Sequence, residues 1–129
     1  MKKLLFFLLL SVSALTSCQS QPAPGQSDGT AVLEAEAYKA KMAALGEVQL
    51  LDVRTPEEYG AGHIEGATLI NFFDADFVER TAAAFDKEKP LMLYCRSGNR
   101  SAKATAKLKA AGFKEIIDLK GGYNAWPKQ

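Results

Sequence analysis

One short segment, "CRSGNRS" at residues 95–101, carries residue types that could do chemistry, and it directly follows the apolar run "LMLY". After Cys95 come residues that tolerate a tight or left-handed backbone, namely Ser97, Gly98 and Asn99. We expect a helix to begin at or just after Asn99. The N–H groups of such a turn can line an anion site, with the positive end of the helix dipole behind it.

Positive side chains at this turn add to the same effect. Arg96 and Arg100 each bring a full charge close to the thiol. Cationic neighbours and a helix N-terminus both favour a thiolate over a thiol, and a thiolate in an anion-binding turn is a nucleophile that faces an anion. The alternative is that Cys95 is an inert, buried side chain at the end of a strand, which is the commoner role of a single cysteine.

Short apolar runs, bounded by glycine, proline or charge, are typical of strands buried on both faces of a sheet. They cover residues 48–53, 67–70, 91–95 and 115–119. Helical patterns lie between them, and Asp74 is predicted to cap the helix of residues 75–85. This alternation predicts an α/β domain with a mostly parallel central sheet and helices on both faces. Cys95 would then lie at the carboxyl edge of the sheet, where ligands gather.

Residues 1–17 have a basic start, a short apolar run and then small residues, the pattern of a secretory signal. The run is shorter than the roughly 20 apolar residues of a membrane span. The following "LTSC" resembles the lipobox of bacterial lipoproteins, which implies a signal peptide and lipid attachment at Cys18. Because Gln19 replaces the Asp that marks inner-membrane retention, we expect an exported protein anchored to the bacterial cell envelope, at the outer membrane facing the periplasm. A disulfide between Cys18 and Cys95 is the alternative.

The chain after the signal divides into a spacer and one domain. Residues 18–30 are polar, with two prolines and two glycines, and are predicted to be the lipidated cysteine and a flexible linker. Residues 31–129 are predicted to form a single domain. Without Lys2 and Lys3, 14 basic residues stand against 15 acidic ones. That balance argues against a nucleic-acid partner held by bulk charge.

Longer blocks of the domain together resemble the single-domain rhodanese-like sulfurtransferases. The blocks are "LLDVRTPEEYGAGHIEGATLIN", "LYCRSGNRSAKATAKLKAAGF" and "DLKGGYNAW". The resemblance extends over residues 32–126 and implies the rhodanese-like α/β fold. It also implies that Cys95 is the catalytic residue, which takes up a sulfane sulfur as a persulfide, and it implies no metal and no organic cofactor.

The same resemblance assigns roles to other residues of these blocks. Arg100 is implied to be a second catalytic residue, which orients the loop. The implied substrate-binding residues are Arg96, Ser97, Gly98, Asn99 and Ser101. Asp52 and Arg54 are implied to form a structural polar knot close to the loop. His63, the only histidine, is expected in a turn and Trp126 in the core, and neither is expected to react.

The implied reaction moves a sulfane sulfur from a donor such as thiosulfate to a thiol or cyanide acceptor. The rival hypothesis is a non-enzymatic module, which either carries sulfur or docks a protein partner. That partner could be a protein that accepts the sulfur. The loop of residues 95–100 is one residue shorter than the loop of rhodanese-like phosphatases and arsenate reductases, which disfavours those activities. Thiol redox chemistry is also disfavoured, because the domain has no second cysteine to resolve a disulfide.

Overall fold

The computed structural model describes residues 28–128, in which strands and helices alternate along the chain. The strands are β1 (Thr30–Leu33), β2 (Gln49–Asp52), β3 (Thr68–Leu69), β4 (Leu91–Tyr94) and β5 (Ile116–Leu119). The helices are α1 (Ala35–Leu45), α2 (Pro56–Gly60), α3 (Phe77–Ala84), α4 (Asn99–Ala110) and the 3-10 helix η1 (Gly122–Ala125). The predicted α/β class is confirmed.

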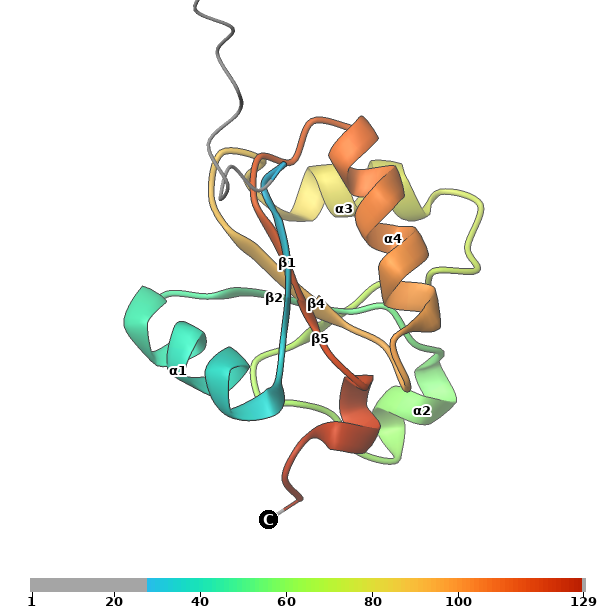
Figure 1. Cartoon of the computed structure of the whole chain (residues 1–129). Coiled ribbons are helices and arrows are strands. Elements are labelled where there is room, and N and C mark those ends of the chain that lie inside the picture. The colour runs from blue at the N-terminus through green and yellow to red at the C-terminus, as the bar shows by residue number, and fades with distance from the viewer. Residues whose placement is uncertain (1–27, 129) are drawn as a thin grey trace, which may run out of the picture.

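The strands form one sheet in the order β1-β5-β4-β2-β3, and every neighbouring pair is parallel. Parallel neighbours need crossover connections, and the helices supply them. Figure 1 shows α3 and α4 on one face of the sheet and α1 with η1 on the other. The central strands β4 and β5 are buried along their whole length, which is why their sequences are almost continuously apolar.

Successive side chains of β4 serve two different cores. Leu91 and Leu93 belong to the cluster beneath α3 and α4, whereas Met92 and Tyr94 belong to the cluster beneath α1 and η1. Side chains alternate between the faces of a strand. Cys95 continues this alternation and joins the first cluster. Its sulfur is therefore placed on the side of the sheet where α4 begins.

Two local features differ from the sequence-based expectations. β1 begins at Thr30, one residue before the predicted start of the domain, and was not predicted as a strand; it is an edge strand, and its Val32 is 63% exposed. The prediction that Asp74 caps the third helix is wrong, because a turn intervenes and Asp76 occupies the cap position. The Asp74 carboxylate accepts a hydrogen bond from Arg80 instead.

The predicted signal of residues 1–17 and the predicted lipid attachment site Cys18 lie outside the described residues. Among residues 28–128, no helix has both the length and the apolar character that crossing a bilayer requires.

The helix η1 contacts the backbone of the loop that follows β4. The Tyr123 N–H donates to the carbonyl oxygen of Cys95 at 2.7 Å, and the Asn124 N–H donates to that of Arg96 at 3.0 Å. Gly122 has a φ of +61°, and a Cβ there would lie 2.5 Å from the Cys95 carbonyl oxygen. The absence of a side chain at residue 122 therefore lets η1 approach this loop.

We predict that Gly122→Ala destabilises the protein more than Gly46→Ala does. Gly46 is a matched control, because its φ of +71° is similar but a Cβ there meets no atom within 4 Å. Both variants pay the strain of a left-handed backbone, about 1–3 kcal/mol, and only Gly122→Ala also displaces the loop. Denaturant unfolding measures both losses, and equal losses would show that the close approach of η1 is unimportant.

Candidate active site

The thiol of Cys95 lies at the start of the loop between β4 and α4 and is 1% exposed. The Gly98 N–H donates a hydrogen bond to Sγ at 3.0 Å, and Sγ lies 3.4 Å from the hydroxyl oxygen of Ser101. Gly98 has a left-handed backbone, with a φ of +109°, and occupies the N-cap position of α4. This conformation, which favours glycine, directs the Gly98 N–H toward the sulfur.

The sulfur has features of both environments that the sequence allowed, a buried apolar one and an anion-binding turn. It belongs to an apolar cluster that includes Val53 and Leu93, yet it accepts a hydrogen bond from a backbone amide at the start of a helix. Among residues 28–128, the Gly98 amide is the one that donates to Sγ. Burial disfavours a charged sulfur, whereas the amide and the helix dipole favour it.

The orientation of the loop peptides follows from their contacts with η1. The carbonyl groups of Cys95 and Arg96 point toward η1, where they accept hydrogen bonds. In a trans peptide the next N–H points the opposite way, so the N–H groups of Arg96 and Ser97 point away from η1. The N–H groups in the first turn of α4 also have no acceptor within the helix. The loop therefore has several backbone N–H groups that neither η1 nor α4 uses as hydrogen-bond donors.

Arg100 closes the loop through an ion pair with Glu58 of α2. Its two terminal nitrogens each lie 2.7 Å from a carboxylate oxygen of Glu58, a bidentate geometry that fixes the guanidinium plane. Hydrogen bonds from Arg100 lower the pKa of Glu58 to about 2. Arg100, which is expected to bring a full charge close to the thiol, is thus also paired with Glu58, and this pair ties α4 to α2.

Glu58 was not among the predicted site residues, although the sequence carries a signal for its position. The Thr55 hydroxyl accepts a hydrogen bond from the Glu58 N–H, and the Glu58 side chain accepts one from the Thr55 N–H, which is a capping box. The spacing of Thr55 and Glu58 is the signature of such a box. It predicts the start of α2, but the partner 42 residues further along the chain cannot be read from local sequence.

Asp52 and Arg54 are brought together as a buried ion pair. The Arg54 Nη2 lies 2.7 Å from Asp52 Oδ2 and 2.7 Å from the Gly62 carbonyl oxygen. Burial lowers the pKa of Arg54, but the Asp52 hydrogen bonds outweigh it and the net pKa is raised. The guanidinium carbon lies 4.3 Å from the centre of the Tyr123 ring. Because the Tyr123 N–H binds the Cys95 carbonyl, this pair is connected to the loop.

The remaining residues assigned to substrate binding lie around the same loop. Arg96, Ser97 and Asn99 are exposed. Ser101 is buried, and its hydroxyl lies 3.0 Å from Oδ2 of Asp118 on β5. Burial raises the pKa of Asp118 to about 6. Sequence reasoning missed Asp118, although a charged residue inside the apolar strand "IIDL" is itself a signal.

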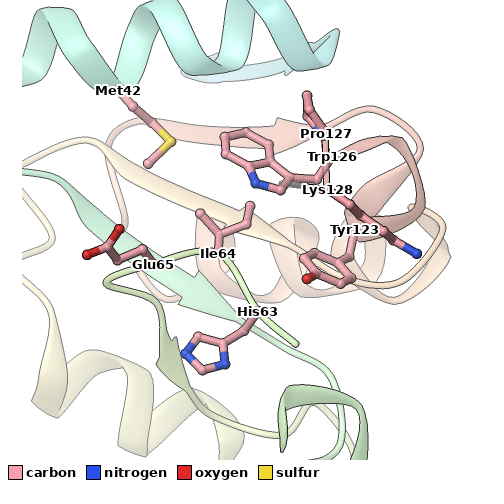
Figure 2. A pocket seen from close by; sticks show the side chains of 8 residues that line it. All are labelled: Met42, His63, Ile64, Glu65, Tyr123, Trp126, Pro127 and Lys128. Carbon is pink, nitrogen blue, oxygen red and sulfur yellow. The ribbon is translucent and has the colours of Figure 1, made fainter. Parts of the chain in front are cut away.

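A cavity of about 630 Å³ lies on the other side of the sheet and does not include the loop of residues 95–101. It is lined by Met42, His63, Ile64, Glu65, Tyr123, Trp126, Pro127 and Lys128, and Figure 2 shows the Trp126 indole close to Met42 and Ile64. The His63 ring stacks on Tyr59 with 3.7 Å between ring centres. Trp126 thus packs against the core, as the sequence predicts, whereas His63 lies in the irregular segment between α2 and β3, just before the turn of residues 65–66. Within residues 28–128, no cluster of three or more His, Cys, Asp or Glu residues is arranged to hold a metal ion.

We predict that Glu58→Gln lowers stability in a pH-dependent way. The folded-state pKa of Glu58, about 2, is below its ordinary value of 4.5. The ion pair with Arg100 therefore stabilises the fold fully above pH 4.5 and less as the pH falls toward 2. Thermal unfolding should show the largest difference between wild type and Glu58→Gln near neutral pH and a small one at pH about 2.

Asp74→Asn is the matched control for this experiment, because Asp74 also pairs with an arginine, Arg80 at 2.8 Å, but both side chains are more exposed than those of Glu58 and Arg100. Exposed pairs of this kind contribute little. If Glu58→Gln cost no more than Asp74→Asn at neutral pH, the pair between Glu58 and Arg100 would not be holding the loop.

Comparisons with known proteins identify the family of this fold. The Rhodanese-like domain family matches residues 34–129. Thiosulfate sulfurtransferase 16, chloroplastic, of Arabidopsis thaliana is 40% identical over 60% of this chain and 72% of its own length. Thiosulfate sulfurtransferase 18 of the same plant is 31% identical over 83% and 87%. A Rhodanese-like domain protein from Staphylococcus aureus has a similar crystal structure, with a TM-score of 0.66 and 32% identity over 76% of this chain and 92% of that one. The chain therefore belongs to the rhodanese-like domain family.

Proposed function

We propose that this protein is a sulfurtransferase that moves a sulfane sulfur from a donor such as thiosulfate to a thiol or cyanide acceptor, through a persulfide on Cys95. One observation carries the proposal: the Gly98 amide, at the N-terminus of α4, donates to Sγ at 3.0 Å. The position favours an anionic sulfur. The thiosulfate sulfurtransferases among its relatives support the donor class.

In the first half-reaction, the Cys95 thiolate attacks the outer sulfur of thiosulfate. A bond forms between Sγ and that sulfur, the sulfur–sulfur bond of thiosulfate breaks, and its electron pair leaves with sulfite. The terminal sulfur of the persulfide then carries the negative charge. The loop amides and the helix dipole stabilise that charge, and the exposed Arg96 attracts the incoming dianion.

In the second half-reaction, a nucleophilic acceptor attacks the terminal sulfur and the Cys95 thiolate leaves with the electron pair of the broken bond. Cyanide gives thiocyanate, and a thiolate gives a new persulfide. The two halves share one covalent intermediate, so ping-pong kinetics are expected. Arg100 acts through Glu58, which holds the start of α4 and so keeps the Gly98 amide in place.

We predict that incubation with thiosulfate adds one sulfur atom to the intact mass of the protein. Cys95→Ser should abolish the gain, and Cys18→Ser, which removes the only other cysteine, should retain it. Intact mass spectrometry measures the change. An unchanged mass of the wild type would contradict the proposal, whereas a mass gain without turnover on cyanide would favour a sulfur carrier with a protein acceptor.

We further propose that the protein is exported and anchored by lipid at Cys18, because "LTSC" follows a signal-like segment and two acyl chains suffice for stable attachment. Cys18→Ala should therefore move the protein from the membrane fraction to the soluble fraction after cell lysis. Cys95→Ala is the control and should stay with the membranes. Retention of Cys18→Ala in the membrane fraction would contradict the anchor.

A further inference from the structure

Asp118 is a buried carboxyl group that the proposed reaction does not use. It is 4% exposed and lies on β5, between β1 and β4 in the sheet. Its Oδ2 lies 3.0 Å from the hydroxyl oxygen of Ser101. Its Oδ1 is buried and has no hydrogen-bond partner within residues 28–128. An incompletely paired carboxylate in such a place is costly, so its contact with Ser101 calls for a physical role.

The Ser101 hydroxyl lies between this carboxyl group and the thiol. Its oxygen is 3.0 Å from Asp118 Oδ2, 3.4 Å from Cys95 Sγ and 3.1 Å from the Gly98 carbonyl oxygen. A hydroxyl has one proton to donate and two lone pairs with which to accept. The group that receives this proton determines whether the sulfur faces the hydroxyl proton or the lone pairs of the Ser101 oxygen.

The charge on Asp118 changes which of these orientations is favoured, with the Gly98 carbonyl oxygen as a second acceptor for the same proton. An ionised carboxylate attracts the Ser101 proton, and the sulfur then meets oxygen lone pairs, which suits a thiol that donates. A neutral carboxyl group can donate to the Ser101 oxygen instead, which allows the hydroxyl to turn its proton toward an anionic sulfur. Two negative charges in this buried place also repel each other.

We propose that Asp118 is a positioning residue for Cys95, which acts through the Ser101 hydroxyl and supports the anionic sulfur when its carboxyl group is neutral. The proton balance is closed within the three side chains. The Cys95 thiol gives its proton to the Ser101 oxygen, and the Ser101 hydroxyl gives its own proton to Asp118 Oδ2. One proton moves from sulfur to carboxylate, and no electrons are transferred.

The other ionisable groups near this chain of contacts do not replace Asp118. On α1, the Tyr38 hydroxyl donates to the Leu93 carbonyl, and burial raises its pKa well above its ordinary value, so it stays neutral. On α4, Arg100 is paired with Glu58. The Asp52 carboxylate is paired with Arg54 on β2, with β4 between that strand and β5.

The pH range in which Asp118 influences Cys95 depends on the pKa of the buried Asp118 carboxyl group. Burial raises the pKa of Asp118 to about 6, so the carboxyl group changes charge around that pH. The consequence for turnover rests on the proposed sulfurtransferase function. The coupling itself does not, because it concerns the ionisation of Cys95 without any sulfur donor, and the two can be tested separately.

The test is the pH titration of the Cys95 thiolate, followed by its ultraviolet absorbance in the full chain carrying Cys18→Ser, so that Cys95 is the one remaining thiol. Asp118→Asn keeps the shape of the side chain and provides a permanent N–H donor to Ser101. We expect it to move the thiolate midpoint to lower pH by about one unit, tenfold in the ionisation constant. An unchanged midpoint, or a midpoint moved to higher pH, would overturn the proposal.

Ser101→Ala separates the contact through the hydroxyl from repulsion through space. In that background we expect Asp118→Asn to shift the midpoint by less than half as much, and a shift retained in full would overturn the role of Ser101.

Thermal unfolding checks the fold of each variant. Because the raised pKa of Asp118 means that ionisation costs stability, Asp118→Asn should be at least as stable as wild type at neutral pH. Failure of the mass test with thiosulfate would leave this titration result standing.

Discussion

The site depends on two backbone hydrogen bonds between η1 and the loop after β4. They hold the carbonyl groups of Cys95 and Arg96 on the η1 side, and planar trans peptides then direct the following N–H groups to the other side. Gly122 is what allows the approach, because any side chain there would meet the Cys95 carbonyl. A displacement of η1 would thus reorient the amides near the thiol, although no side chain of η1 is hydrogen-bonded to the sulfur.

Around this loop the structure places two buried carboxylates in different situations. Asp52 is matched by Arg54 with several hydrogen bonds, so its charge is compensated. Asp118 has one hydroxyl partner and one unpartnered oxygen within residues 28–128. A compensated pair stabilises one geometry across a wide range of pH, whereas a poorly compensated group responds to pH. The pair of Asp52 and Arg54 and the Asp118 carboxyl group lie on opposite sides of β4 and its loop.

The strands β2, β4 and β5, the start of α4 and the position of Cys95 could be predicted from sequence, because apolar runs and the turn residues around Gly98 are local signals. β1 was missed because an edge strand with an exposed Val32 has no buried pattern to detect. The partners Glu58 of Arg100 and Asp118 of Ser101 were missed for a different reason. Each joins elements far apart in sequence, and only the packing of α4 against α2 and β5 brings them together.

The parallel sheet also determines which way the thiol faces relative to the rest of the chain. All strands run in one direction, so their first residues share one rim of the domain and their last residues share the opposite rim. Figure 1 shows the beginning of β1 at the far end of the molecule from α2 and η1. A tether attached ahead of Thr30 would therefore hold the domain at the rim opposite to the loop that carries Cys95.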